Sequence, residues 1–313
     1  MRISRLLIVG LLLIVPGFAD AAVTPDGVPE TSTWYFHADF EQMRTSDAGK
    51  HLYGWLQREV FEDIHDDAGI DLDKEADRIT AFSDVESGAV VLIEGDISQD
   101  SRDKLLALAA GAESLETYEH KSKTFYFAEG ERSGRDGESN GRSEIEIDSF
   151  DNGVYFTFAL KNRLLATSTR EKMESLLASN GKIPLRKTTD GTLVVLTAEK
   201  SLIQAGMKAD QVDDDGDGGW QSNILKNTEQ VAVLVADVAG KIGVETQLIA
   251  KQPEMAESLA SIVRGLISLT MFSDEMDPDI LEFLQGTSVE VDGSKLKISV
   301  SVDPEMLIAV LDD

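Results

Sequence analysis

The stretch SVEVDGSKLKISVSV, residues 288–302, indicates the fold class most clearly. Apolar and polar residues alternate on both sides of the pair Asp292-Gly293. An alternation with a period of two is typical of a strand with one buried face, and Asp-Gly is a preferred two-residue hairpin turn. The stretch therefore predicts an antiparallel β-hairpin.

A helix is expected on each side of this hairpin. Pro253 begins a segment that carries apolar residues at helical spacing from Met255 to Ile267, and proline is favoured in the first turn of a helix. Asp303 is a helix cap, and Pro304 follows it directly. Because the helices are segregated from strands that pair as hairpins, the pattern predicts an α+β fold with mostly antiparallel sheets packed with helices.

An earlier stretch repeats the pattern. Residues 143–148, SEIEID, resemble residues 287–292, TSVEVD, and they lead to a second turn pair, Asn152-Gly153, with a return strand over 154–160. The expected order of elements is also the same in both halves: strand, helix, two strands, long helix, hairpin and closing helix. We therefore expect an internal duplication with halves at 22–187 and 188–313, although the first half has extra strands and such an order also recurs by chance in α+β chains.

Five further elements are expected from composition and spacing. The first strand covers residues 33–40, and a helix begins near Ser46. Residues 89–94 and 193–196 are nearly all apolar, which predicts two buried strands. Ser98 caps a helix that buries one apolar side, with Leu105 and Leu108 among its residues.

Two of these segments carry a resemblance. The aromatic strand that ends in Ala-Asp, residues 35–39, and the apolar strand Gly88–Gly95 are similar to segments of a loosely defined group of uncharacterised exported bacterial proteins. The resemblance covers most of the chain after residue 21. It implies a duplicated α+β fold with no assigned activity, so no site residues follow from it.

The first 21 residues predict a secretory signal peptide. Arg2 and Arg5 precede a ten-residue apolar run, and Ala19 and Ala21 are the small residues that a signal peptidase recognises. Ten apolar residues are too few to cross a bilayer, which needs about 20. We expect cleavage after Ala21 and a periplasmic or secreted protein without an integral membrane segment. An uncleaved anchor is the alternative.

The composition excludes several classes of partner and chemistry. The chain has 313 residues, no cysteine, and 29 basic against 57 acidic residues, for a net charge of −28. Such a charge repels phosphates, so nucleic acid is not expected as a partner. The lack of cysteine excludes disulfides, thiol nucleophiles and cysteine metal sites.

No set of residues predicts a catalytic site or a cofactor. His-Glu-x-x-His and Gly-x-Ser-x-Gly motifs are absent. Ser101-Arg-Asp-Lys104 has the Ser-x-x-Lys spacing of penicillin-recognising enzymes, but the other motifs of that class are missing, and a solvated helix start explains it as well. A helix end that carries acids likewise explains Glu62, His65 and Asp66, which could otherwise contact a metal.

One segment has the pattern of a metal loop. Asp213, Asp215 and Asp217, followed by Gly218, match the first half of a calcium-binding loop, in which oxygens at positions 1, 3 and 5 surround the ion. Position 12 is Ile224 instead of the usual bidentate glutamate. The alternatives are a weak Ca²⁺ site and a solvated acidic loop.

These observations favour a non-enzymatic binding or scaffold protein of the cell envelope, with a protein or a small molecule as its partner. The alternative is a hydrolase with an unrecognised carboxylate site. A broad exposed apolar surface would favour the first hypothesis, and a pocket with two close acids would favour the second.

Overall fold

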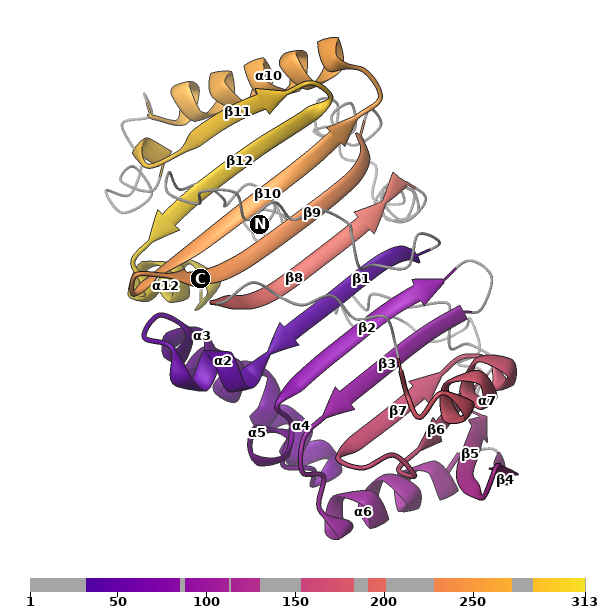
Figure 1. The fold of residues 1–313 in the computed structure, drawn as a ribbon. Helices are drawn as coiled ribbons and strands as arrows, with labels where there is room; N and C mark the ends of the chain where they lie inside the picture. The colour runs from indigo at the N-terminus through magenta and orange to yellow at the C-terminus, as the bar shows by residue number, and fades with distance from the viewer. Residues whose placement is uncertain are drawn as a thin grey trace, which may run out of the picture. The chain divides into compact units, whose positions relative to one another are not determined.

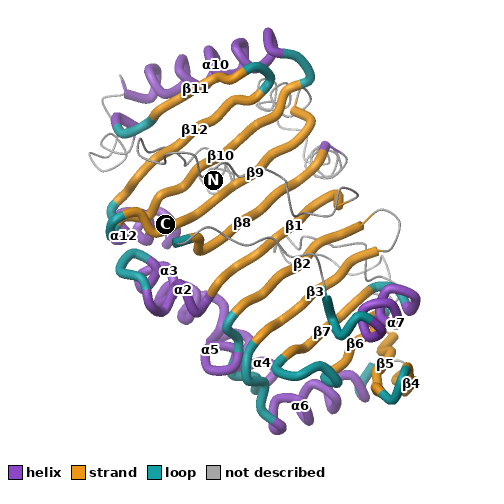
Figure 2. Tube along the Cα trace, viewed as in Figure 1, coloured by secondary structure: helices purple, strands orange, loops and turns teal. Residues whose placement is uncertain are grey.

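The computed structural model describes residues 32–84, 88–112, 114–129, 153–182, 191–200, 228–271 and 284–312 (Figure 1). The expected signal peptide, the strand expected at 143–148 and the acidic loop with Asp213, Asp215 and Asp217 lie outside these ranges. The described chain is an α+β protein with antiparallel strands, as the sequence predicted (Figure 2).

The described residues fall into two compact units. Unit 1 comprises residues 33–55 and those from 191 onward, and unit 2 comprises residues 56–182. Unit 1 thus combines the first described strand with the C-terminal part of the chain. The halves expected at 22–187 and 188–313 stay a prediction.

Unit 1 is built on antiparallel strands that neighbour one another in the order β1-β8-β9-β10-β12-β11. Its strands are β1 (Ser32–Asp39), β8 (Thr192–Glu199), β9 (Thr228–Val238), β10 (Lys241–Ala250), β11 (Ser288–Asp292) and β12 (Lys295–Val302). Its helices are α2 (Phe40–Thr45), α3 (Gly49–Leu56), α10 (Pro253–Met271) and α12 (Pro304–Asp312).

The hairpin at 288–302 and its flanking helices are confirmed. β11 pairs with β12 through Asp292 and Lys295, which lie opposite each other at the turn. α10 begins at Pro253 and contacts β10, β11 and β12. Its Arg264 donates a hydrogen bond from Nη2 to the carbonyl oxygen of Val289 on β11 at 2.8 Å.

A short helix precedes the one that the sequence predicted near Ser46. Asp39 ends β1, and its side chain accepts a hydrogen bond from the backbone N–H of Gln42 at 2.8 Å, so α2 begins at Phe40. The predicted helix is confirmed as α3, which begins at Gly49, where Ser46 Oγ accepts a hydrogen bond from the backbone N–H at 3.1 Å.

Asp237, near the end of β9, holds the connection between α2 and α3. Its Oδ2 accepts a hydrogen bond from the backbone N–H of Ala48 at 2.8 Å, and its Oδ1 accepts one from Gly240 at 3.0 Å. Burial would raise the pKa of Asp237, but the N–H groups of Gly240 and Ala48 stabilise the charged form and hold the pKa below its usual value.

Unit 2 has strands in the order β2-β3-β7-β6-β5-β4, also antiparallel. The strands are β2 (Arg78–Asp84), β3 (Gly88–Glu94), β4 (Ser114–His120), β5 (Lys123–Glu129), β6 (Val154–Thr157) and β7 (Arg163–Thr167). The helices are α4 (Glu62–Ala68), α5 (Leu72–Glu75), α6 (Gln99–Ala110) and α7 (Arg170–Ala178), with a π-helical turn at Gln57–Phe61 before α4.

Two sequence predictions in unit 2 were wrong. The return strand expected over 154–160 ends at Thr157, and it pairs with β5 and β7. Leu108, expected inside, is 53% exposed. At 3.6 residues per turn, the apolar residues at 105, 106, 108 and 109 cover an arc of about 160° on α6, and Leu108 lies at the edge of that arc.

The two units share an order of elements. In unit 2 the chain forms β2, β3, α6, the strands β4 to β7 and α7, and β7 returns beside β3. In unit 1 it forms β9, β10, α10, the strands β11 and β12 and α12, and β12 returns beside β10. This recurrence is compatible with duplication, which stays a prediction because the order alone does not establish common ancestry.

Candidate functional site

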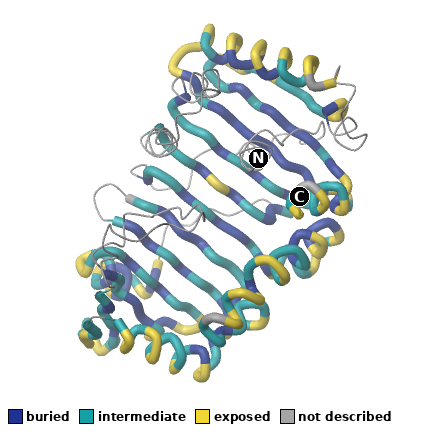
Figure 3. Tube along the Cα trace, turned by 180° about the vertical axis from the view of Figure 1, so that it is seen from behind, coloured by how far each residue is buried: buried dark blue, intermediate teal, exposed yellow. Residues whose placement is uncertain are grey.

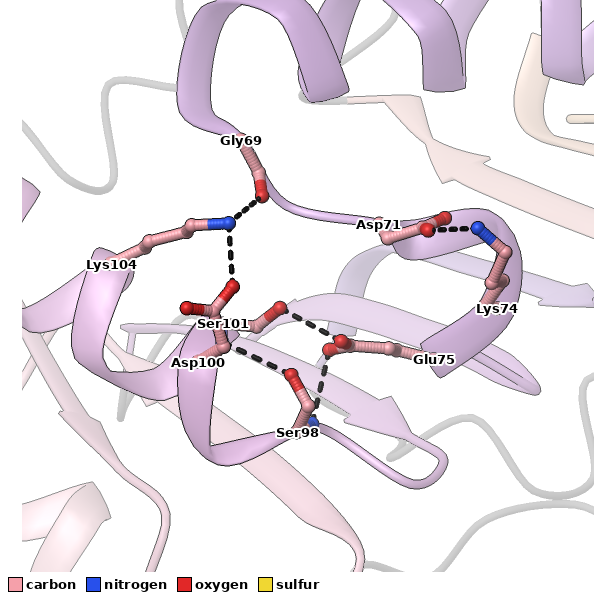
Figure 4. Close-up of polar contacts among 8 residues, drawn as sticks. All are labelled: Gly69, Asp71, Lys74, Glu75, Ser98, Asp100, Ser101 and Lys104. Atoms are coloured by element: carbon pink, nitrogen blue, oxygen red, sulfur yellow. Dashed lines mark hydrogen bonds and ion pairs between the residues drawn. The ribbon is translucent and has the colours of Figure 1, made fainter.

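Ser101 and Lys104, the residues of the Ser-x-x-Lys motif, lie in the first turns of α6 (Figure 4). The predicted cap is confirmed, since Ser98 Oγ accepts a hydrogen bond from the backbone N–H of Ser101 at 3.1 Å. The Ser101 side chain is buried, with 2% of the residue exposed, and its hydroxyl donates to Glu75 Oε1 at 2.8 Å.

Glu75, at the end of α5, connects that helix to the start of α6. Its Oε2 accepts a hydrogen bond from the backbone N–H of Ser98 at 3.2 Å, so one carboxylate binds two residues of the α6 N-terminus. Gly95 permits the close contact between its own backbone and that of Glu75. A Cβ atom on residue 95 would lie 1.9 Å from the carbonyl oxygen of Glu75, and the Gly95 φ angle of +153° is in the range that favours glycine.

Lys104 has partners of its own. Its Nζ donates to the carbonyl oxygen of Gly69 at 2.8 Å and lies 2.6 Å from Asp100 Oδ2. Gly69 follows the last residue of α4 in a left-handed conformation, so the ammonium group stabilises the negative end of that helix.

This cluster lacks the arrangement of a nucleophilic serine. Such a serine must reach a substrate and transfer its proton to a base. Ser101 is buried and hydrogen-bonded to Glu75, and Lys104 is bound to Gly69 and Asp100. The cluster therefore connects α4, α5 and α6 and stabilises their packing.

Asp71 and Lys74 form an ion pair beside this cluster (Figure 4). Their hydrogen bond lowers the pKa of Asp71 and raises the pKa of Lys74. The Lys74 side chain is 75% exposed, and such exposed pairs contribute little to stability.

The described residues contain no group of three or more acidic or histidine side chains that could hold a metal ion. Glu62, His65 and Asp66, considered above as metal contacts, are exposed along α4. The structure does not test Asp213, Asp215 and Asp217, because they lie outside the described ranges.

Glu245 on β10 is an acidic residue that the sequence analysis missed. It is 1% exposed, and its Oε1 accepts a hydrogen bond from Gln247 Nε2 at 2.6 Å. Lys297 Nζ lies 2.9 Å from Glu245 Oε2, which is an ion-pair distance, but the two groups do not meet the angular criteria of a hydrogen bond. A carboxylate that is paired and enclosed in this way is a poor general base. An acid between apolar residues of one strand, Ile242 to Val244 and Leu248 to Ala250, with a lysine in a later strand, is the signal that could have identified the pair.

Aromatic side chains of the neighbouring strands β4, β5 and β6 form a cluster in unit 2. The Tyr118 ring stacks on Phe125 with centroids 5.2 Å apart, and the Arg170 guanidinium lies 4.4 Å from the centroid of Tyr118. Tyr118 also donates a hydrogen bond to Glu116, which raises the pKa of its hydroxyl. Because α7 contacts β4 and β6, these rings are part of the packing between that helix and the strands.

One face of β1, β8 and β9 in unit 1 is apolar and partly exposed. Phe36, Leu196 and Val233 lie side by side in the strand register, so their side chains share that face. None of the three is fully buried, and Leu196 is 42% exposed. We name this surface the apolar face; its residues are Trp34, Phe36, Val194, Leu196, Ala198, Val231, Val233 and Val235.

The opposite side of the same strands is the buried one. His37, Val195 and Leu234 form a row on that side, and all three are buried. Buried positions alternate with more exposed ones along much of β8 and β9 (Figure 3). Antiparallel sheets with one solvated face usually carry polar residues there. The strand predicted to be buried at 193–196 is present, but it is buried on one side only, because Val194 and Leu196 are on the exposed side.

Comparison with known proteins identifies no family. No family model and no curated protein matches the chain. Among solved structures, crystal form IV of TP0453 is similar with a TM-score of 0.47 and 10% identity, over 90% of this chain and 93% of that one. Crystal form III gives a TM-score of 0.45, also at 10% identity, over 93% and 98%. This degree of similarity establishes neither a shared function nor a shared fold.

Proposed function

We propose that the protein is exported, is cleaved after Ala21, and acts outside the cytoplasm as a non-enzymatic binding or scaffold protein. The observation that supports this proposal is the apolar face. Phe36, Leu196 and Val233, which lie in one row of this face, are partly exposed. A surface rich in charged residues would be expected instead, since the chain has a net charge of −28. A contiguous apolar patch of this kind is typical of interaction surfaces.

The partner is a protein segment that combines apolar side chains with positive charge. The chain after residue 21 has 27 basic and 56 acidic residues, since residues 1–21 hold two arginines and one aspartate, so its net charge is −29. Asp39, Glu199 and Asp237 are at or near the ends of the three strands that carry the apolar face. Negative charge around an apolar centre attracts a basic partner and repels an acidic one.

Two synthetic peptides test this proposal. A fluorescent peptide of alternating lysine and leucine should bind, and its glutamate-leucine counterpart should not, as measured by fluorescence anisotropy. Leu196→Gln should weaken the binding because it removes the most exposed side chain of the apolar face. Leu108→Gln is the matched control, since Leu108 is a leucine of similar exposure in unit 2. Equal binding of both peptides, or equal effects of both variants, would contradict the proposal.

Export is tested separately. When the full-length protein is produced in a bacterial host, the periplasmic fraction should contain a species that begins at Ala22. A protein that keeps Met1 and sediments with the membranes would contradict export as a soluble protein. Among the described residues, no helix is both long and apolar enough to cross a bilayer.

A further inference from the structure

Helix α10 carries most of the large apolar side chains that are exposed among the described residues. Five such side chains are exposed there, and three of them, Ile262, Leu269 and Met271, belong to this helix. Ile262 is 40% exposed and Leu269 is 71% exposed. The contacts of α10 with β10, β11 and β12 use another side of the helix, whose buried residues are Ala256, Leu259, Ala260 and Val263.

The exposed apolar residues form a stripe along α10. Ile262 and Leu269 are seven residues apart, so they lie on the same side of the helix. Ser258 precedes Ile262 by four residues, and Gly265 precedes Leu269 by the same interval. This spacing of alternately three and four residues is that of a helix that packs lengthwise against another helix. We name this surface the helix stripe; its residues are Met255, Ser258, Ile262, Gly265, Leu266 and Leu269.

Gly265 leaves space on this stripe. It is exposed in the interior of α10, where glycine weakens a helix relative to alanine. A Cβ atom on residue 265 would meet no heavy atom within 4 Å outside the backbone of its own helix. No contact in the described part of the chain therefore requires a glycine at this position, whereas a second helix could approach closely there.

We propose that the helix stripe pairs with the same stripe of a second copy of this chain, with the two α10 helices antiparallel. In this arrangement Ile262 faces Gly265 of the second copy, and Leu269 faces Ser258 of the second copy. Each large exposed side chain thus meets a small residue. The two-fold symmetry of such a dimer repeats both contacts, so one pair of helices forms a self-complementary interface.

The distribution of charge favours this partner and this direction. The chain has a net charge of −28, so two copies repel each other over most of their surface. No acidic residue occurs from Ser258 to Ser273, and pairing along this segment brings few carboxylates together. Glu254 and Glu257 lie at the start of α10. A parallel pair would place them beside their copies, whereas the antiparallel pair separates the two Glu257 residues by about 20 Å along the axis.

Sedimentation equilibrium of the purified protein tests the proposal. Because one helix from each copy forms the contact, the interface is at the small end of the size range, and we expect a reversible dimer with a Kd in the micromolar range. Raising sodium chloride to about 0.15 M should strengthen the dimer, because the salt screens the repulsion between the copies.

Two variants distinguish pairing through α10 from other causes. Leu269→Gln should raise the dimer Kd about tenfold, whereas Leu108→Gln, the matched change at an exposed leucine of α6, should leave it unchanged. Gly265→Ala should raise the Tm of the monomer, because alanine favours the helix, and should also raise the dimer Kd, because its methyl group occupies the space of Ile262 from the second copy. These two effects of Gly265→Ala have opposite signs, which general damage to α10 would not produce.

Three outcomes would overturn the proposal. A protein that stays monomeric over the whole concentration range would leave the helix stripe to a partner of another kind. A dimer of unchanged affinity in Leu269→Gln or in Gly265→Ala would be formed by another surface. A dimer that Leu196→Gln weakens as much as Leu269→Gln does would be formed by the apolar face, whose proposed binding of a basic peptide is otherwise independent of this test.

Discussion

Replacing Asp237 with asparagine should destabilise unit 1. The carboxylate accepts hydrogen bonds from the backbone N–H groups of Ala48 and Gly240, one on each oxygen. Asparagine has one acceptor oxygen, so its NH₂ group would face the second donor. Ala48 is fully buried, and its N–H would find no water. A lost hydrogen bond to a charged group costs about 1.5–3 kcal/mol, which is the expected decrease in the free energy of unfolding at pH 7.

The pH dependence distinguishes this cause from general damage. The pKa of Asp237 is below its usual value in the folded protein, so the stabilisation is fully present above the unfolded pKa of about 3.9. This stabilisation is lost as the pH falls through the pKa that Asp237 has in the folded protein, which is below the unfolded value. The difference between the wild type and Asp237→Asn should therefore be largest near neutral pH and should shrink in acid.

Urea denaturation at a series of pH values measures both effects. Asp47→Asn is the matched control, because it removes the same charge from the connection between α2 and α3 that Asp237 holds. Its side chain is 88% exposed and lies 3.6 Å from Lys50, so it should cost about 0–1 kcal/mol. If the two variants lose equal stability, or if the Asp237→Asn deficit does not change between pH 7 and pH 3, the role assigned to the Asp237 carboxylate is refuted.

Three further predictions concern other parts of the chain. Ser101→Ala should lower the stability of unit 2 by about 1–2 kcal/mol, because Glu75 loses a buried hydrogen-bond donor. A serine-directed fluorophosphonate probe should leave Ser101 unlabelled, and labelling of Ser101 would contradict its structural role. Lys297→Met should cost about 3–5 kcal/mol by leaving the Glu245 charge unpaired, and adding Glu245→Gln should restore much of that loss in thermal unfolding. If Asp213, Asp215 and Asp217 bind Ca²⁺, calcium should raise the Tm more than magnesium does, and Asp213→Asn with Asp215→Asn should abolish the difference.

Local patterns predicted the elements whose signals are contained in their own residues. The hairpin of β11 and β12 follows from strict alternation around Asp292-Gly293, and α10 begins at the proline that the sequence indicated. These segments need no information about their partners, because turn chemistry and periodicity fix them.

Predictions that depended on distant partners were less successful. The apolar run at 193–196 predicted a strand correctly, but it could not show that only one side of β8 is buried. Ser101 and Lys104 suggested a catalytic pair by their spacing, whereas their bonds go to Glu75 and Gly69, which precede them by more than 25 residues. Lys200 and Lys251 both pair with Glu229, at 2.8 and 3.8 Å, beside an irregularity in the pairing of β9 with β10 that no local pattern indicated.

The bond from Arg264 to Val289 has a consequence for self-association. β11 is the outermost strand of unit 1 in the strand order, and a free strand edge can pair with another molecule. Arg264 occupies one edge carbonyl with a side chain from α10, and the exposed acids Glu290 and Asp292 lie along the same strand. In unit 2 the outermost strand, β4, carries the exposed acids Glu116 and Glu119. The charges of these acids and the Arg264 bond thus protect the outermost strands from pairing with the strands of a second molecule.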